Sequence, residues 1–166
     1  MASLIRELID TLEQQNNIYT SLLDVGAKKK VSIVDNNISM LQQFVREENV
    51  LIGKNQRLEK KRLEIFNDIA VVLGKNKEIS LKDVIEMING QDGEKELTEL
   101  REKMLDVLPK LKTINDQNQE LLKMSIDYVD FSINSMRDIS NGAPAYYDLA
   151  GNEINSSDKK MFDITQ

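Results

Sequence analysis

Hydrophobic residues recur every three or four positions along three long stretches of the chain, the spacing expected for one face of an α-helix. The stretches cover residues 3–26, 35–74 and 93–140. Between the last two, Ser80 and Asp83 have the spacing of a capping box, which predicts a short helix ending near Gly90. Pro109 falls on the solvent side of the last stretch, where a proline is expected to bend the helix without breaking it.

Long helices joined by short connections must lie antiparallel to bury their hydrophobic faces. The sequence therefore predicts an all-α fold, an elongated antiparallel bundle of three long helices plus one short helix and a C-terminal tail. The bundle domain is expected to cover residues 1–141 and the tail residues 142–166. The lysines at positions 28–30 are interpreted as a solvated connection between the first two helices.

Several polar residues interrupt the hydrophobic faces of the second and last helices. They are Glu48, Asn55, Arg62, Asn115 and Asn118. Buried polar groups cost free energy unless they find partners, so we expect them to form a structural polar layer between these helices. An antiparallel register that places Asn55 opposite Asn115 would satisfy both amides and fix helix alignment, as a buried asparagine does in coiled coils. A catalytic role is disfavoured because Glu48 and Arg62 would lie roughly 21 Å apart along the helix axis.

The last predicted helix carries two hydrophobic stripes in its final third. One continues the predicted core face through Leu122, Ile126, Val129, Ile133 and Met136. The second, on a nearly opposite side, consists of Leu121, Met124, Tyr128 and Phe131. Its methionine and aromatic content suits a groove for an amphipathic helix of a partner. Burial against the first helix and self-association are the alternatives, and the stripe alone does not identify a partner.

Composition narrows the possible functions. The 166-residue chain has neither cysteine nor histidine, which removes thiol nucleophiles, the usual zinc sites and the Ser-His-Asp arrangement. We therefore expect no enzyme activity, no cofactor and no metal site. The net charge of −6 disfavours nucleic acid as a partner. No stretch is apolar enough to insert into a membrane and no secretory signal is present, so a cytoplasmic location is expected.

The predicted tail holds aromatic and aliphatic residues among polar ones. It includes Tyr146 and Tyr147, and it is too apolar for a simple solubilising extension and too short to form its own core. We expect residues 143–166 to dock on an apolar surface, in the place that a partner would take. Tyr146 and Tyr147 are accordingly candidate partner-binding residues, and a disordered tail is the alternative.

Several segments together resemble the FlgN family of flagellar export chaperones. They are VREENVL around Glu48, LEKKRLEIF around Arg62, SLKDVI after the second helix, NDQNQELL on the last helix and AYYDLAG in the tail. The resemblance implies a cytoplasmic chaperone of bacterial flagellar type III export. Such a chaperone would bind the C-terminal helical ends of hook-associated (hook-filament junction) proteins through its C-terminal part and deliver them to the export apparatus.

A self-associating structural bundle without a secreted client is the rival hypothesis. The chaperone hypothesis predicts a monomer or weak self-association, whereas the rival predicts a stable oligomer held together by the second stripe. A mass measurement in dilute solution distinguishes the two.

Overall fold

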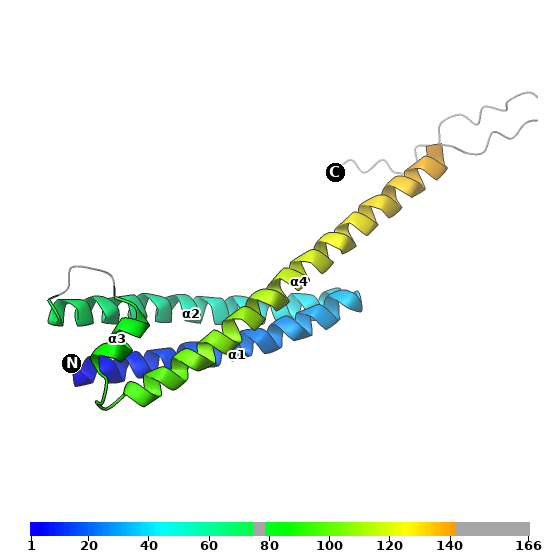
Figure 1. The fold of residues 1–166 in the computed structure, drawn as a ribbon. Coiled ribbons are helices and arrows are strands. Elements are labelled where there is room, and N and C mark those ends of the chain that lie inside the picture. Colours follow the sequence, from blue (N-terminus) through cyan, green and yellow to red (C-terminus); the bar gives the residue numbers. More distant parts are fainter. Residues whose placement is uncertain (75–78, 142–166) are drawn as a thin grey trace, which may run out of the picture. The chain divides into compact units, whose positions relative to one another are not determined.

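The computed structural model describes residues 1–74 and 79–141, and this part of the chain contains four helices and no strand (Figure 1). The helices are α1 (Ala2–Val34), α2 (Ile38–Val72), α3 (Leu81–Met87) and α4 (Glu94–Asn141). The predicted all-α class is therefore confirmed. The chain divides into two units, Met1–Leu122 and Lys123–Gln166, so α4 contributes its first part to one unit and its last part to the other.

Helix α1 is longer than the sequence pattern predicted. It continues past Gly26 to Val34 and includes the three lysines, so the expected connection at residues 28–30 is wrong. Lysine is a good helix former, and nothing in this segment stops a helix. The ammonium group of Lys28 lies 2.7 Å from the Asp24 carboxylate one turn earlier. The hydrogen bond and the charge of Asp24 raise the pKa of Lys28.

Two asparagines make the turn between α1 and α2. Asn36 has a φ of 52°, a left-handed conformation that asparagine tolerates better than most residues. The side chain of Asn37 caps α2, because its Oδ1 accepts a hydrogen bond of 3.1 Å from the backbone N–H of Met40. This tight turn lets α1 and α2 lie side by side and antiparallel (Figure 1).

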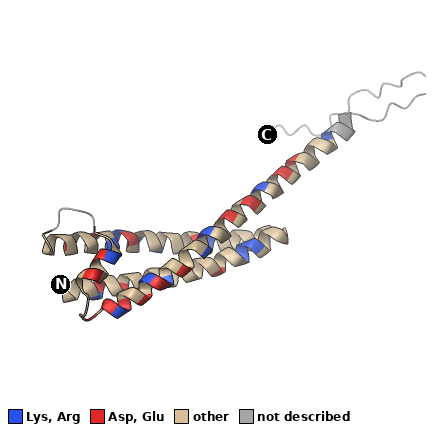
Figure 2. Ribbon diagram, viewed as in Figure 1, with Lys and Arg blue, Asp and Glu red and all other residues tan. Residues whose placement is uncertain are grey.

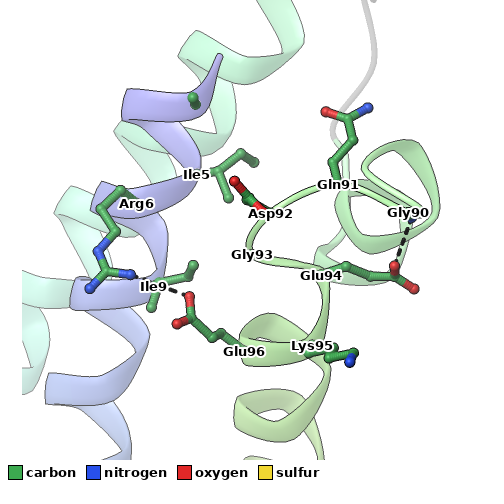
Figure 3. Close-up of a pocket in the computed structure, with 11 residues that line it drawn as sticks. Ile5, Arg6, Ile9, Gly90, Gln91, Asp92, Gly93, Glu94, Lys95 and Glu96 are labelled. Carbon is green, nitrogen blue, oxygen red and sulfur yellow. Dashed lines mark hydrogen bonds and ion pairs between the residues drawn. The ribbon is translucent and has the colours of Figure 1, made fainter.

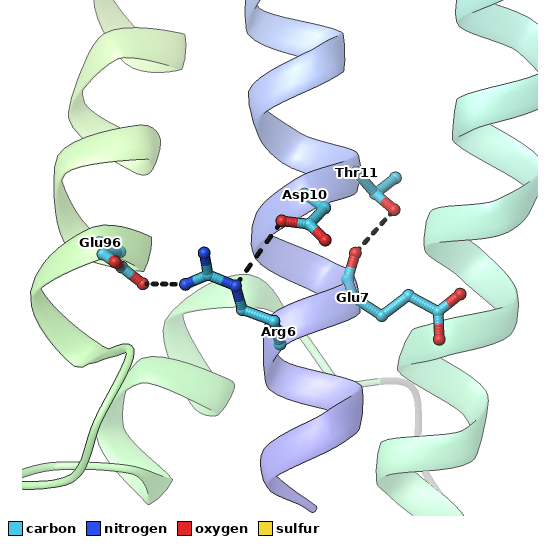
Figure 4. Close-up of polar contacts among 5 residues, drawn as sticks. All are labelled: Arg6, Glu7, Asp10, Thr11 and Glu96. Carbon is cyan, nitrogen blue, oxygen red and sulfur yellow. Dashed lines mark hydrogen bonds and ion pairs between the residues drawn. The ribbon is translucent and has the colours of Figure 1, made fainter.

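In the first unit, α4 runs in the same direction as α1. Arg6 contacts Glu96 near the start of both helices, at a sequence separation of 90 residues (Figure 4). Near the end of α1, Lys30 donates to Gln117 at a separation of 87. A nearly constant separation requires parallel helices. By contrast, contacts between α1 and α2 have separations of 44 for Gln15 and 19 for Lys29, as antiparallel helices require.

Hydrophobic residues from all four helices form one core in the first unit. The most deeply buried are Leu8, Leu12, Ile69, Val84 and Leu97. Burying each such side chain contributes about 1.5–3 kcal/mol relative to leaving it in water. Thr11 is also fully buried, and its hydroxyl donates to the Glu7 carbonyl of the preceding turn (Figure 4).

Helix α3 closes one end of this core. The predicted capping box is confirmed, because the Ser80 hydroxyl accepts from the Asp83 N–H while the Asp83 carboxylate accepts from the Ser80 N–H. The chain then enters α4 through Gly93, whose φ is +95°. A Cβ at this position would lie 2.8 Å from Cγ2 of Ile5, so both the backbone conformation and the close approach to α1 require glycine.

Basic and acidic residues are both distributed along the helices (Figure 2). Pro109 lies inside α4 and is exposed, and the helix continues through it as predicted. None of the helices at positions 1–74 and 79–141 is long and apolar enough to cross a membrane.

Candidate partner-binding surface

The last part of α4 exposes the second hydrophobic stripe that the sequence singled out. The exposed fractions of Met124, Tyr128 and Phe131 are 61%, 71% and 69%. We call these three residues the aromatic face. Leu121, the remaining member of the stripe, is half-buried and belongs to the first unit. The aromatic face is therefore an apolar surface available to a partner.

The other stripe of the same segment is also exposed, contrary to expectation. Ile126, Val129, Ile133 and Met136, which we call the aliphatic face, were predicted to continue the core. Their exposed fractions are 60%, 53%, 43% and 69%, and only Leu122 before them is half-buried. The prediction of a core face is therefore wrong beyond Leu122.

The length of α1 explains this difference. Contacts between α1 and α4 keep sequence separations of 87 to 92 residues, and α1 ends at Val34. The end of α1 therefore lies near the last residues of α4 in the first unit. Hydrophobic spacing alone does not reveal where the covering helices stop.

The two faces lie on different sides of the helical segment. At about 100° per residue their centres lie roughly 140° apart. Ser125 and Ser132 lie in the narrower arc between them, and the wider arc carries Lys123, Asp127, Asp130, Asn134 and Arg137. A soluble helix usually has one apolar stripe about 100° wide. This segment therefore has one apolar stripe more than a helix that packs on one side requires.

The predicted pairing of Asn55 with Asn115 is wrong. Asn55 instead accepts a hydrogen bond of 3.4 Å from Nε2 of Gln15 on α1, and Asn115 is exposed. The helix directions that motivated the prediction are correct, but the register is not. The partner of Asn55 lies on α1 and not on α4.

Asn118 is buried, as the sequence predicted, but it too bonds to α1. Its Nδ2 donates a 2.9 Å hydrogen bond to the backbone carbonyl of Gly26, and its exposed fraction is 2%. Ile114, one turn earlier, packs directly over Gly26, where an added Cβ would lie 3.0 Å from Cγ2 of Ile114. The absence of a side chain at Gly26 thus admits α4 close enough for this hydrogen bond.

The two charged members of the predicted layer have separate partners. Glu48 forms an ion pair of 2.7 Å with Lys29 of α1, and the two side chains are only 16% and 12% exposed. Arg62 pairs with Glu59 one turn earlier on α2, at 2.5 Å. Glu48 and Arg62 therefore make distinct contacts, and the predicted residues do not form a single layer.

Sequence reasoning missed Gln15, which is fully buried between α1 and α2. Its Nε2 lies within hydrogen-bond distance of Asn55 and of Glu59, at 3.4 and 3.0 Å. A signal was present, because Gln15 follows Leu12 by three residues and precedes Tyr19 by four, the spacing of the core stripe itself. A polar residue at such a position predicts a buried polar contact.

A hollow of about 680 Å³ lies between the start of α1 and the loop that enters α4 (Figure 3). Ile5 and Ile9 line it together with residues 90–96. Two of its charged groups are engaged within the fold, since Glu96 pairs with Arg6 and the Glu94 carboxylate accepts from the Gly90 N–H. These two contacts belong to the junction between α1, the loop and the start of α4.

The sequence matches the FlgN family over residues 1–154. The chain belongs to the FlgN family. This is a family of flagellar export chaperones and not of enzymes. Neither the curated proteins nor the solved structures gave a match to the chain.

The FlgN match includes the exposed segment of α4 and continues into the tail. It covers Tyr146 and Tyr147, which lie outside the described residues. The family resemblance drawn from short motifs is therefore confirmed, whereas the role of the two tyrosines stays a prediction.

Proposed function

We propose that this FlgN-family protein is a cytoplasmic chaperone that binds the C-terminal helical ends of hook-filament junction proteins and delivers them to the flagellar type III export apparatus. Family membership supports the export role. The exposure of Met124, Tyr128 and Phe131 is the observation that supports the binding site. The chaperone acts as a monomer or weakly associating chain.

The first unit serves as the scaffold in this proposal. Helices α1 and α2 form an antiparallel hairpin, the first part of α4 contacts α1 in the same direction, and α3 closes one end of the core. Its stability comes from its own core, which includes Leu8 and Leu97. Client binding therefore does not have to supply the free energy of folding for this unit.

The chemistry of the aromatic face favours a helical client. Positions 124, 128 and 131 are spaced by four and three residues, so their side chains form a ridge that fits between side chains of another helix. Methionine adapts its shape to different partners, and tyrosine and phenylalanine provide large contact areas at low entropic cost. An amphipathic helix laid along this ridge would bury its own apolar face at the same time.

Removing the two aromatic rings tests this assignment. The double variant Tyr128→Ala/Phe131→Ala should bind the C-terminal fragment of a hook-filament junction protein on the order of 10- to 100-fold more weakly, because aromatic anchors dominate interface energies. Isothermal titration calorimetry with the fragment from the same organism measures the affinity. The free energy of unfolding should change little, since both rings are exposed in the free protein.

A matched control uses two exposed leucines in the first unit. Leu63 and Leu105 are 53% and 56% exposed, so Leu63→Ala/Leu105→Ala removes exposed apolar surface outside the proposed site. This control should bind the fragment with unchanged affinity. Equal weakening in both variants would contradict a localised site, and a large loss of unfolding free energy in the aromatic variant would assign the rings to the core.

A further inference from the structure

The chain itself carries a segment that matches the aliphatic face of α4. We infer that residues 144–164 fold back as an antiparallel helix and pack on Ile126, Val129, Ile133 and Met136 in the free protein. This contact goes beyond the proposed function, because it forms without a client. The end of α4 and the tail belong to the same unit of the chain, Lys123–Gln166. Residues 144–164 lie outside the described residues, and it is their sequence that carries the match.

The tail repeats apolar residues with the spacing of a helix face. Positions 147, 150, 154, 157, 161 and 164 alternate steps of three and four residues. Position 157 is a serine, and the other five are Tyr147, Ala150, Ile154, Met161 and Ile164. Residues at these steps form a single stripe of the kind with which a helix packs against one neighbour. The tail therefore has the pattern of a helix with one face to bury.

This stripe aligns with the aliphatic face in one antiparallel register. Positions 126, 129, 133 and 136 step by three, four and three residues, as positions 147, 150, 154 and 157 do. Antiparallel helices with the same alternation place their stripe residues in facing layers. In three successive layers both residues are apolar, and their numbers sum to 283. The layers are Met136 with Tyr147, Ile133 with Ala150, and Val129 with Ile154.

The residues between the two stripes suit a turn between helices. Helix α4 ends at Asn141, and Gly142 follows at the position where glycine commonly ends a helix. Pro144 comes two residues later, and proline is favoured at the first position of a helix. Antiparallel helices are commonly joined by loops of about two to five residues. The layer of Met136 and Tyr147 would then lie about one helical turn from the loop on both sides.

The border of the aliphatic face admits a helix at close range. On the side toward the aromatic face it is flanked by Ser125 and Ser132, which have short side chains. The Ser132 hydroxyl donates a 2.8 Å hydrogen bond to the Tyr128 carbonyl of its own helix. In the opposing stripe, Ala150 is small where Ile133 is large, so the two side chains can share one layer. No long side chain has to move from this border when the tail packs on the face.

The same register places Tyr146 beside the aromatic face. Ser125, Ser132 and Tyr146 each stand one position before a contact residue, and such residues lie on the same side of an antiparallel helix pair. The two serines lie in the arc between the faces of α4. Tyr146 therefore borders the aromatic face and shields part of it from a client. This consequence rests on the proposed client site, whereas the helix pairing does not.

The contact is weak enough to open. It joins two helices through three apolar layers, and a helix with so little packing is only marginally stable in water. Docked and open forms therefore coexist, and the docked fraction lowers the apparent client affinity. Opening has little effect on the first unit, because residues of the described helices form its core.

Disulfide trapping tests the register, because the chain has no cysteine of its own. The full-length variant Ile133→Cys/Ala150→Cys joins one predicted layer. The matched control is Ile133→Cys/Leu149→Cys, in which position 149 lies about 130° from the centre of the tail stripe. A disulfide requires β-carbons about 3.5–4.5 Å apart, so it reports the side of the tail that faces α4. Non-reducing electrophoresis and mass spectrometry follow its formation in dilute solution.

The variant that joins a predicted layer should form an intramolecular disulfide about 10-fold faster than the control. Val129→Cys/Ile154→Cys, which joins the next layer, should behave in the same way. The trapped form of Ile133→Cys/Ala150→Cys should bind the C-terminal fragment of a hook-filament junction protein at least about twofold more weakly than its reduced form. Isothermal titration calorimetry measures both affinities.

Four results overturn the inference. Equal rates in the layer variant and the control would show that the tail has no fixed register on this face. Disulfides between two chains, seen as a doubled mass, would assign the face to a second copy. Faster trapping of Phe131→Cys/Ala150→Cys would place the tail on the aromatic face. Trapping as expected with unchanged client affinity would refute the shielding by Tyr146.

Failure of the proposed function gives a different result. If the reduced chain does not bind the fragment at all, the client site is refuted. The rates of disulfide formation still decide whether the tail packs on the aliphatic face, because they are measured without a client.

Discussion

The single helix α4 carries the same hydrophobic spacing in two regions with opposite burial. Leu97, Leu100, Met104 and Val107 are at most 7% exposed, whereas Ile126, Val129, Ile133 and Met136 are 43–69% exposed. The two regions have similar residue types and the same steps along the helix. Periodicity therefore identifies the face that a helix can bury, but it does not say whether the chain supplies the helix that covers it.

The difference has a functional meaning in an export chaperone. The covered region is stabilised by the chain's own helices. The uncovered region retains apolar surface, and we propose that a client removes this surface from water. Contiguous apolar surface on a soluble protein commonly marks an interaction site or an aggregation hazard. This interpretation is tested by variants of each region whose free energy of unfolding and client affinity are measured.

The largest difference should appear between two methionines of α4. Met104 is 6% exposed and Met136 is 69% exposed. Met104→Ala leaves a cavity in the core and should lower the free energy of unfolding by about 2–5 kcal/mol. Met136→Ala removes a solvated side chain and should change it by less than about 0.5 kcal/mol. Urea unfolding followed by circular dichroism measures both.

Valines provide a second matched pair on the same helix. Val107 is 7% exposed and Val129 is 53% exposed. Val107→Ala should therefore lower the free energy of unfolding more than Val129→Ala does. If alanine at positions 129 and 136 lowers the free energy of unfolding as much as alanine at positions 104 and 107, the last part of α4 is covered in the free protein. The two regions would then not differ in burial.

The next largest effect should come from the last buried polar contact of the first unit. Asn118→Ala removes the hydrogen bond to the Gly26 carbonyl and leaves that buried acceptor without its side-chain donor. Because Gly26 lies inside α1 and its carbonyl keeps the bond within that helix, we expect a loss of about 0.5–1.5 kcal/mol in the free energy of unfolding. Asn115→Ala, at an exposed position three residues earlier, is the control and should have little effect. A similar result for both variants would mean that the contact at Asn118 does not stabilise the covered region.

Sequence reasoning predicted the elements well because their signals are local. The capping box of Ser80 and Asp83, the continuation of α4 through Pro109 and the start of α4 after Gly93 all follow from neighbouring residues. The end of α1 was missed because the lysines at 28–30 favour a helix as readily as a solvated loop. The stop signal, Asn36 and Asn37, comes ten or more residues after Gly26, near which the hydrophobic stripe ends.

Contacts between helices were harder to predict than the helices. The polar residues at Asn55 and Asn118 were recognised as unusual, yet both bond to α1, through Gln15 and Gly26. Hydrophobic spacing gives the face of each helix but leaves its axial register open, since a shift of seven residues restores a similar face. Ile114 packs closely over Gly26, and a single glycine does not reveal such a contact in a sequence.

The smallest predicted effect concerns the tail and the uncovered region. Residues 143–166 include Tyr146 and Tyr147, and a tethered segment has a high effective concentration near the helix to which it is attached. If these tyrosines occupy the aromatic face for part of the time, they reduce the apparent client affinity by the fraction of molecules that remain open. Deleting residues 143–166 should therefore tighten client binding by about two- to fivefold, because a weakly bound tail would occupy the aromatic face in only part of the molecules. The free energy of unfolding should stay constant, since residues of the described helices pack against one another in the core of the first unit. The full-length variant Tyr146→Ser/Tyr147→Ser should reproduce the tighter binding in the same calorimetric titration. Weaker binding would instead make the tail a client contact, and unchanged affinity in both variants would leave the aromatic face open to the client at all times.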